Sequence, residues 1–407
     1  MKRTLLAAAT VAMILVAPGV ADATDLFGVE ATYSGGTITQ TASSLPDLVE
    51  ALVNNQGAFA PLLGNNFTGN LTYYGIPNAV TVDVQGDTQL TITSPLTGLN
   101  RTFTGTDRSS LEEQLTDWLL KDGSDEAAKL VQAAAERSAA AITDGNPSSA
   151  TARMADRAFG AFGLFPAARV MRGSEPGHYT ALWFHTRQSK ADTPVGTAES
   201  AEYELNVPWW LNFGRHFSLI GNANGQYMDT EGTAIYGAGS DLGLGIRPFV
   251  RAAESSFGWQ ITPFVGLQGV GTYDGATGGL LNQFGVTSRL EFRLPRGILL
   301  IVANQFSHFN SLELKIEDVE IDPMVDQNVL KNGLMVDVPV WTAKSLFANG
   351  FVVDTRFLED AAVDNYQTLG VGLALRGDRM SLNGYVSRDF ASDYSSWNAG
   401  IGLAFGL

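Results

Sequence analysis

The sequence contains no cysteine among its 407 residues. This absence excludes disulfide bonds, thiolate metal sites, thiol nucleophiles and a lipid-modified N-terminal cysteine. Basic side chains are also few, because 26 Lys and Arg stand against 42 Asp and Glu and give a net charge of −16. Binding to a phosphate backbone needs clustered Lys and Arg, so this balance predicts that nucleic acid is not a partner.

Long apolar runs are missing as well. After the first 20 residues no apolar run reaches the roughly 18 residues that a membrane helix needs. Charged residues make up 17% of the chain, against about 25% in ordinary soluble domains. The 44 glycines exceed their usual share of about 7%. These features argue against a helical membrane protein, but they leave open a membrane protein built from strands.

The first 23 residues have the pattern of an export signal. Lys2 and Arg3 precede an apolar stretch over residues 5–16, and Ala21-Asp22-Ala23 provides a small-x-small cleavage site. The pattern predicts a secretory signal peptide over residues 1–23, with the mature chain beginning at about Thr24. We therefore expect a protein that is periplasmic, secreted or inserted in an outer membrane.

Residues 24–173 show mixed patterns. Short alternating segments separated by Gly and Pro are typical of strands, and the segments around 44–54, 107–120, 126–141 and 150–164 have helical spacing. We expect a small periplasmic α+β domain that ends in a helical linker.

Residues 174–407 alternate between apolar and polar side chains. In the segment 202–212, Tyr203, Leu205 and Val207 alternate with Glu202 and Glu204. This segment is one of twelve such runs, many of them 10 to 14 residues long, whereas strands of soluble proteins average about 5 to 6. A soluble β-sandwich also alternates, but the strand length favours a membrane barrel. The fold class predicted is an all-β transmembrane antiparallel barrel of about 12 strands.

The expected connections between these runs differ in length. They are long at 188–200 and 229–240 and short at 214–216, 295–297 and 377–379. Long loops on one side and tight turns on the other are typical of outer-membrane barrels. An even strand number then predicts both ends of the barrel on the periplasmic side, together with residues 24–173.

The last strand carries a resemblance. Trp397, Ile401, Leu403, Phe405 and Leu407 lie at alternate positions of the C-terminal segment. This segment resembles the assembly signal of Gram-negative outer-membrane β-barrel proteins, although those usually end in an aromatic residue rather than leucine. The resemblance covers residues 178–407 and concerns the architecture class. It implies a location in the cell outer membrane, contact with lipid and lipopolysaccharide, and recognition of the C-terminal strand by the barrel-assembly machinery.

Charged residues on the polar face of the strands are the candidates for lining the lumen. Such charges need water or an opposite charge. They either pair across a closed lumen or line a narrow aqueous pore, and the sequence leaves both outcomes open. The candidates are Glu202, Glu204, Asp241, Arg247, Arg251, Arg289, Glu291, Arg293, Asp337, Asp354 and Arg356.

Residues suited to catalysis or metal binding are scarce. None of the four histidines lies at metal-ligand spacing from another. Ser311 and His308 would lie on opposite faces of a strand, so no local triad forms. We expect no catalytic residue, metal or cofactor and no enzymatic activity. The acidic loop 317–326 suits a solvated loop better than a Ca²⁺ or lipopolysaccharide-bridging site. Aromatic girdles at the membrane boundaries are expected from Trp183, Trp209, Trp210, Trp259, Trp341, Trp397, Tyr203 and Tyr227.

Three functions fit these patterns. The first is a narrow channel or transporter for small polar solutes, in which residues 24–173 plug or gate the pore. The second is a non-conducting structural or surface-display barrel that anchors a periplasmic domain. The third, a barrel lipid hydrolase, has the least support because a local triad is missing.

Overall fold

The computed structural model describes residues 25–164 and 178–406. Gaps within these ranges fall at 43–44, 55, 63–64, 122–125, 127–128, 131, 135, 139–144, 231–232, 250–255, 273–277, 313, 317–318, 322–323, 342–344 and 378. The predicted signal peptide, Arg251 and part of the acidic loop lie outside the described residues, as does much of the helix expected over 126–141.

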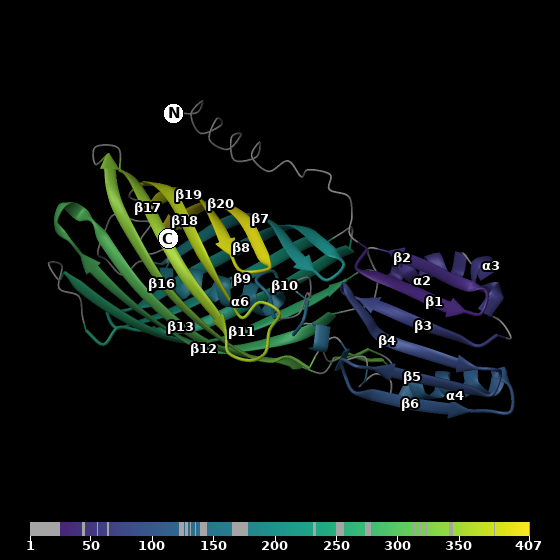
Figure 1. Cartoon of the computed structure of the whole chain (residues 1–407). Helices are drawn as coiled ribbons and strands as arrows, with labels where there is room; N and C mark the ends of the chain where they lie inside the picture. The colour runs from purple at the N-terminus through teal and green to yellow at the C-terminus, as the bar shows by residue number, and fades with distance from the viewer. Residues whose placement is uncertain are drawn as a thin grey trace.

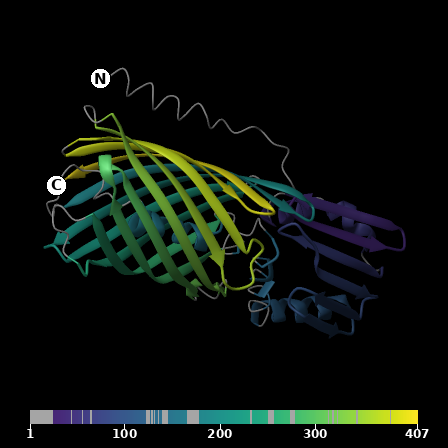
Figure 2. The same ribbon diagram turned by 60° about the vertical axis from the view of Figure 1, so that its left-hand side comes forward.

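Twelve antiparallel strands close into a barrel, which confirms the predicted fold class and strand number (Figures 1 and 2). Each strand pairs with its neighbours along the chain, and β20 closes the barrel by pairing with β7. The small hairpin of β14 (Leu314–Ile316) and β15 (Val319–Ile321) lies outside this ring. The strands of the barrel are β7 (Tyr179–Thr193), β8 (Gly196–Phe213), β9 (Phe217–Thr230), β10 (Thr233–Ile246), β11 (Phe257–Thr272), β12 (Gly278–Arg293), β13 (Leu299–Leu312), β16 (Asp326–Trp341), β17 (Leu346–Phe357), β18 (Asn365–Arg376), β19 (Met380–Phe390) and β20 (Tyr394–Gly406).

Several strands are longer than their alternation predicted. β7 and β8 have 15 and 18 residues and join directly through a turn at 194–195. The long connections expected at 188–200 and 229–240 are therefore wrong, because most of these residues extend the β-ladder. Most of them are small or polar, so the alternation that marks a membrane strand fades although the pairing continues. Loop length does not distinguish the two ends of the barrel.

The pleat of the barrel turns apolar side chains outward. On β18, Leu369, Val371 and Leu373 are 59%, 59% and 57% exposed. The inward side chains are often polar and buried, such as Gln283, Thr287 and Gln305. This arrangement is the reverse of that in a water-soluble barrel, whose interior is apolar and whose exterior is polar.

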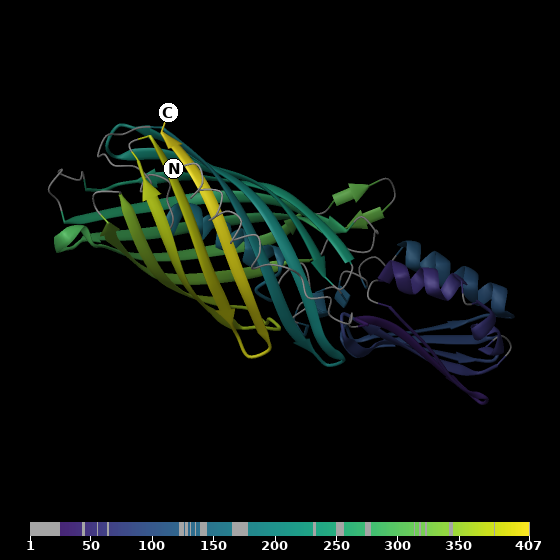
Figure 3. The same cartoon turned by 90° about the horizontal axis from the view of Figure 1, so that it is seen from above.

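The N-terminal unit, residues 25–146, contains an open sheet of six antiparallel strands in the order β2-β1-β3-β4-β5-β6. Helices α2 (Leu45–Asn54) and α4 (Arg108–Lys121) lie on one face of it (Figure 3). Leu111 and Trp118 of α4 pack on Ile92 and Phe103. The short helices α3 (Gln56–Phe59) and η1 (Ala60–Leu62) follow α2. The strands are β1 (Phe27–Tyr33), β2 (Gly36–Ala42), β3 (Phe67–Tyr73), β4 (Ile76–Gln85), β5 (Gln89–Ser94) and β6 (Leu99–Thr104).

The N-terminal unit sits at one particular end of the barrel. We call the end where β7 begins and β20 finishes the terminal end, and the opposite end the far end. Tyr73 and Tyr74 belong to one buried cluster with Met228 and Ile235, which lie at the far end of β9 and β10. Figure 1 shows the N-terminal unit next to one end of the barrel. Burial raises the pKa of the Tyr73 phenol well above its usual value, so this ring stays neutral.

The prediction that residues 24–173 lie at the same end as both barrel ends is therefore wrong. Residues 150–164 lie in the lumen, between this unit at the far end and β7, which begins at the terminal end. No helix among the described residues is long and apolar enough to cross a membrane.

Candidate functional site

A short helical segment fills part of the barrel lumen. It consists of α6 (Ala150–Ala158) and one stretch of π-helix, η2 (Phe159–Leu164). The side chain of Ser149 caps α6 by accepting a hydrogen bond from the backbone N–H of Ala152. Small residues such as Ala152, Ala155 and Ala158 are fully buried, which lets the helix approach the barrel wall closely. The segment 150–164 was expected to be helical, but the sequence did not place it inside the barrel.

One side of α6 binds acidic residues of β8. Arg153 donates from Nε to Glu202 Oε1 at 2.9 Å and from Nη2 to Glu204 Oε2 at 3.2 Å. Arg157, one turn later, donates from Nη1 to Glu204 Oε1 at 3.4 Å and from Nη2 to Gln268 at 2.7 Å. These charges are buried, and each guanidinium meets at least one carboxylate. This is the condition under which buried charges are tolerated.

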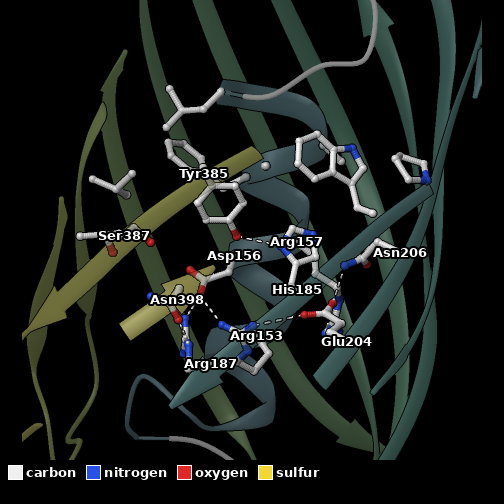
Figure 4. Close-up of a pocket in the computed structure, with 18 of the residues that line it drawn as sticks. Arg153, Asp156, Arg157, His185, Arg187, Glu204, Asn206, Tyr385, Ser387 and Asn398 are labelled. Atoms are coloured by element: carbon white, nitrogen blue, oxygen red, sulfur yellow. Dashed lines mark hydrogen bonds and ion pairs between the residues drawn. The ribbon is translucent and has the colours of Figure 1, made fainter. Parts of the chain in front are cut away.

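Asp156 of α6 binds basic residues of β7, the neighbour of β8, and of β16 on the opposite side of the barrel. Asp156 accepts from Lys331 Nζ at 2.6 Å, from Arg187 Nη2 at 3.2 Å and from Tyr366 OH at 3.1 Å. Arg153 Nη1 also reaches Asp156, at 2.9 Å (Figure 4). The wall thus presents acidic groups on β8 and basic groups on β7 and β16, and the helix carries the complementary charge toward each.

The chain enters the lumen at the far end through further hydrogen bonds. Val363 N–H donates to the carbonyl of Gly145 at 3.0 Å. The hydroxyls of Ser148 and Tyr394 lie 2.6 Å apart, and Thr151 donates to Gln327 at 3.0 Å. Hydrogen bonds from several strands of the rim therefore hold the start of the segment in place.

The segment ends in apolar contacts nearer the terminal end. Phe159 and Leu164 pack with Ile301 and Met335, and Phe162 packs on Phe264 with ring centroids 4.9 Å apart. Gly333 permits this packing, because a Cβ built there would lie 2.8 Å from the Phe159 ring. The lumen is thus filled by ion pairs in its middle and by aromatic rings beyond them.

A cavity of about 160 Å³ remains beside the helix. The imidazole Nδ1 of His185 and the hydroxyl of Tyr385 lie 2.8 Å apart in its wall (Figure 4). Trp183 stacks on His185. Its other lining residues include Arg187, Glu204, Asn206, Ser387 and Asn398. Its charged lining groups are those that already bind the helix or one another.

The structure brings five predicted lumen residues inside as buried side chains: Glu202, Glu204, Asp241, Arg289 and Asp337. Only Glu202 and Glu204 bind the helix. Arg289 pairs with Glu291 on the same strand, and Asp337 pairs with Arg376 at 2.7 Å. Arg247 bonds Gln260 just after β10, and Arg293 is exposed at the end of β12.

Two residues predicted to line the lumen face the outside of the barrel instead. On β17 the inward positions are Val353 and Thr355, so Asp354 and Arg356 lie on the outer surface. They pair with each other at 2.9 Å, with side chains 29% and 62% exposed. They are near the far end of β17, where polar side chains on the outer surface can reach water. The assumption that a charge on a barrel strand points inward fails there.

Sequence reasoning missed the residues that matter most to this site. Arg153, Asp156 and Arg157 lie at i, i+3 and i+4 in an alanine-rich helix, and this spacing was the available signal. Their partners Arg187 and Lys331 lie in alternating strands, and nothing in the local sequence distinguishes them from other polar residues there. Trp183 and Trp210 also line the lumen cavity rather than a girdle, whereas Trp341 and Trp397 do face outward, 51% and 59% exposed.

The site offers little to a metal or a nucleophile. Within the described ranges no group of three or more His, Asp or Glu side chains is placed to hold a metal ion. Ser311 accepts a hydrogen bond from the N–H of Val325, and His308 contacts Asn328. The arrangement is suited to holding a helix by charge pairing.

Comparison with known proteins gives structural matches only. No protein family matches the sequence, and no curated protein matches it. The translocator domain of the autotransporter NalP from Neisseria meningitidis matches with 11% identity and a TM-score of 0.45, over 63% of this chain and 96% of that one. The transport unit of the autotransporter AIDA-I from Escherichia coli matches with 11% identity and a TM-score of 0.40, over 62% and 97%. An outer membrane channel from Pseudomonas putida F1 matches with 8% identity and a TM-score of 0.40, over 58% and 97%. At these identities the likeness concerns the fold alone.

Proposed function

We propose that this protein is an outer-membrane barrel that displays its N-terminal unit on the outer surface and whose lumen is sealed by residues 150–164. The observation that carries the proposal is the set of ion pairs between α6 and both sides of the barrel wall. Of the functions that the sequence left open, this geometry favours the non-conducting display barrel over the open channel.

The outer wall supports a membrane location. A tilted strand crosses the hydrocarbon core with about 9 to 11 residues, and the barrel strands have 11 to 18. Exposed apolar side chains alternate along them, as Leu369, Val371 and Leu373 illustrate. In water these side chains would form an apolar patch much larger than soluble proteins expose.

The topology and the sequence together support an orientation in the membrane. Twelve strands bring the start of β7 and the end of β20 to the same end. The export pattern and the resemblance of the last strand to an assembly signal favour a periplasmic location for that end. The N-terminal unit, which packs at the far end, is then outside the cell rather than in the periplasm.

The ion pairs support a sealed lumen in the resting protein. If the helix left, Glu202 and Glu204 would lose both arginines, and Lys331 would lose Asp156. Removing one partner of a buried pair typically costs about 3 to 5 kcal/mol. The loss of these pairs therefore opposes the departure of the helix. The cost falls only as far as water enters the emptied lumen and solvates the charges left behind.

Planar-bilayer recording of the full mature chain tests the seal. We expect no steady conductance from the wild type. Asp156→Arg places a cation against Lys331 and Arg187, so we expect it to expel the helix and produce channel openings. Asp354→Arg, on the outer wall, is the matched control and stays closed. Steady conductance from the wild type contradicts the proposal and restores the channel function.

Epitope accessibility on intact cells tests the orientation. One tag is inserted after Asp87, in the exposed turn between β4 and β5, and another after Arg215, in the turn between β8 and β9. We expect antibody to bind the first tag on intact cells and the second only after permeabilisation. The reverse result would place the N-terminal unit in the periplasm.

A further inference from the structure

The sheet of the N-terminal unit ends in an unprotected edge. Among the described residues, β1 is the one strand that pairs with β2, so the other side of β2 is free of strand pairing. β2 reads Gly-Thr-Ile-Thr-Gln-Thr-Ala and has no charge, no proline and no bulge. Natural sheets usually protect a free edge with one of these devices. The other edge strand, β6, does carry a charge, Arg101.

The backbone groups that point outward from this edge belong to three threonines. β1 and β2 join through a two-residue turn and pair in a continuous register from Tyr33 and Gly36. Such a turn closes on a hydrogen-bonded pair, after which bonded and non-bonded pairs alternate. Thr37, Thr39 and Thr41 fall at the non-bonded positions, so their N–H and C=O groups face away from β1. The carbonyl of Thr41 accepts from the side chain of Gln40 at 3.2 Å, as a carbonyl at a free edge can.

We propose that this edge is a homotypic docking site, at which β2 of one molecule pairs antiparallel with β2 of a second copy. A two-fold axis at Thr39 places Thr39 opposite its own copy and Thr37 opposite Thr41. The three threonines then form about six backbone hydrogen bonds between the molecules. The interface is isologous and closes as a dimer.

Charge explains why a second copy can approach here. Residues 25–146 carry 15 acidic and five basic side chains, so two N-terminal units repel each other over most of their surface. β2 carries no charge. Two acidic side chains lie beside it: Glu30 is directly opposite Thr39 across β1 and β2, and Asp25 accepts a hydrogen bond from the hydroxyl of Thr41. The edge is therefore a place where identical units meet without a charge on the pairing strand, and Thr–Thr pairs across strands are favourable.

The direction of β2 determines what such a dimer connects. Leu26 and Phe27, near the beginning of β1, belong to the cluster that contacts the barrel, whereas the turn at 34–35 points away from it. The strands of the unit thus run outward from the barrel rim (Figures 1 and 3). Antiparallel pairing places the two barrels at opposite ends of the dimer. On the proposed function, the two barrels lie in two facing membranes, and the edge joins cells that carry the same protein.

One edge of seven residues gives a small interface, so each contact is weak. Many copies on two facing surfaces make the attachment strong through multivalency. We therefore expect weak, concentration-dependent dimers in detergent and visible clustering of cells that express the protein.

Cysteine cross-linking tests the register on the full mature chain in detergent, because the wild type has no cysteine. Bonded antiparallel partners have Cα atoms about 5.5 Å apart, within disulfide range. We expect Thr39→Cys to form covalent dimers at least about tenfold faster than Ile38→Cys or Thr102→Cys on β6. Ile38 would face Gln40 of the partner rather than itself. Equal rates for the three variants would overturn the proposal, and this result does not depend on a membrane orientation.

Charge substitution tests the attachment between cells. Thr39→Lys places a cation opposite Glu30 within the sheet, so the unit keeps its fold, but it sets lysine against lysine in the dimer. We expect cells carrying Thr39→Lys, or Thr39→Glu, to cluster at least about tenfold less than wild type. Mixing the two populations should restore clustering, and Thr102→Lys should have no effect. Failure of wild-type cells to cluster while the tag after Asp87 is accessible would overturn the docking edge and leave the display function standing.

Discussion

Arg153 donates from Nε to Glu202 at 2.9 Å, and this contact joins a helix within the barrel to the barrel's own wall. The two side chains are 8% and 3% exposed, so water does little to weaken the pair. The same guanidinium also meets Glu204 and Asp156. Arg153 therefore connects the acidic side of the lumen to the residue that binds its basic side.

Replacing Arg153 should loosen the helix strongly. Arg153→Met keeps the apolar stem but removes the guanidinium that binds Glu202, and removal of one buried partner costs about 3 to 5 kcal/mol. We expect bursts of conductance in planar bilayers and a lower urea midpoint. Arg356→Met removes an exposed pair on the outer wall and should cost about 0 to 1 kcal/mol. Equal effects of the two substitutions would show that the interior pair does not hold the helix.

Filling the space at Gly333 should displace the helix by contact rather than charge. A Cβ there would meet the Phe159 ring at 2.8 Å and Leu164 Cδ1 at 2.9 Å. We expect Gly333→Val to cost about 1 to 3 kcal/mol through overpacking. Gly271→Val is the control, because a Cβ at Gly271 has nothing within 4 Å. Thermal unfolding of both variants in detergent measures the difference, and a Gly333 variant as stable as its control would refute the close contact.

A charge in the middle of the outer wall should oppose membrane insertion. Val371, 59% exposed near the centre of β18, is expected to face hydrocarbon. Val371→Arg should destabilise the inserted barrel by about 2 to 4 kcal/mol, whereas Gln367→Arg near the strand end should cost about 0 to 1 kcal/mol. Reversible unfolding from lipid vesicles provides the measurement. Similar costs at both positions would argue against a bilayer around this wall.

The docking of the N-terminal unit should depend on the cluster at the far end. Ile235 is 2% exposed and packs in this cluster with Met228 and Tyr73. We expect Ile235→Ala to cost about 2 to 5 kcal/mol in local stability and to speed protease cleavage between the unit and the barrel. Leu242→Ala on the same strand, 44% exposed on the outer wall, should leave cleavage unchanged. Unchanged cleavage of both variants would mean that the unit does not rely on this contact.

The sequence by itself determined the elements with a strong period. Alternation over residues 178–407 predicted the barrel and its twelve strands, because a wall between lipid and a polar lumen requires unlike faces on every strand. It also predicted helical structure over 150–164. The strand ends were predicted less well, since polar residues on both faces look like a loop although they continue the pairing.

Only the tertiary structure decided where the helix lies and what the charges do. Arg153, Asp156 and Arg157 are separated from their partners on β7, β8 and β16 by about 30 to 180 positions, and no local pattern specifies such pairings. Which of its two faces each strand turns toward the lumen was also decided by the tertiary structure, so that Glu202 faces the helix while Asp354 faces outward. The position of residues 150–164 in the lumen also decided which end of the barrel carries the N-terminal unit. The alternation or helical spacing of a segment tells which of its side chains share a face, but not where in the molecule the segment lies.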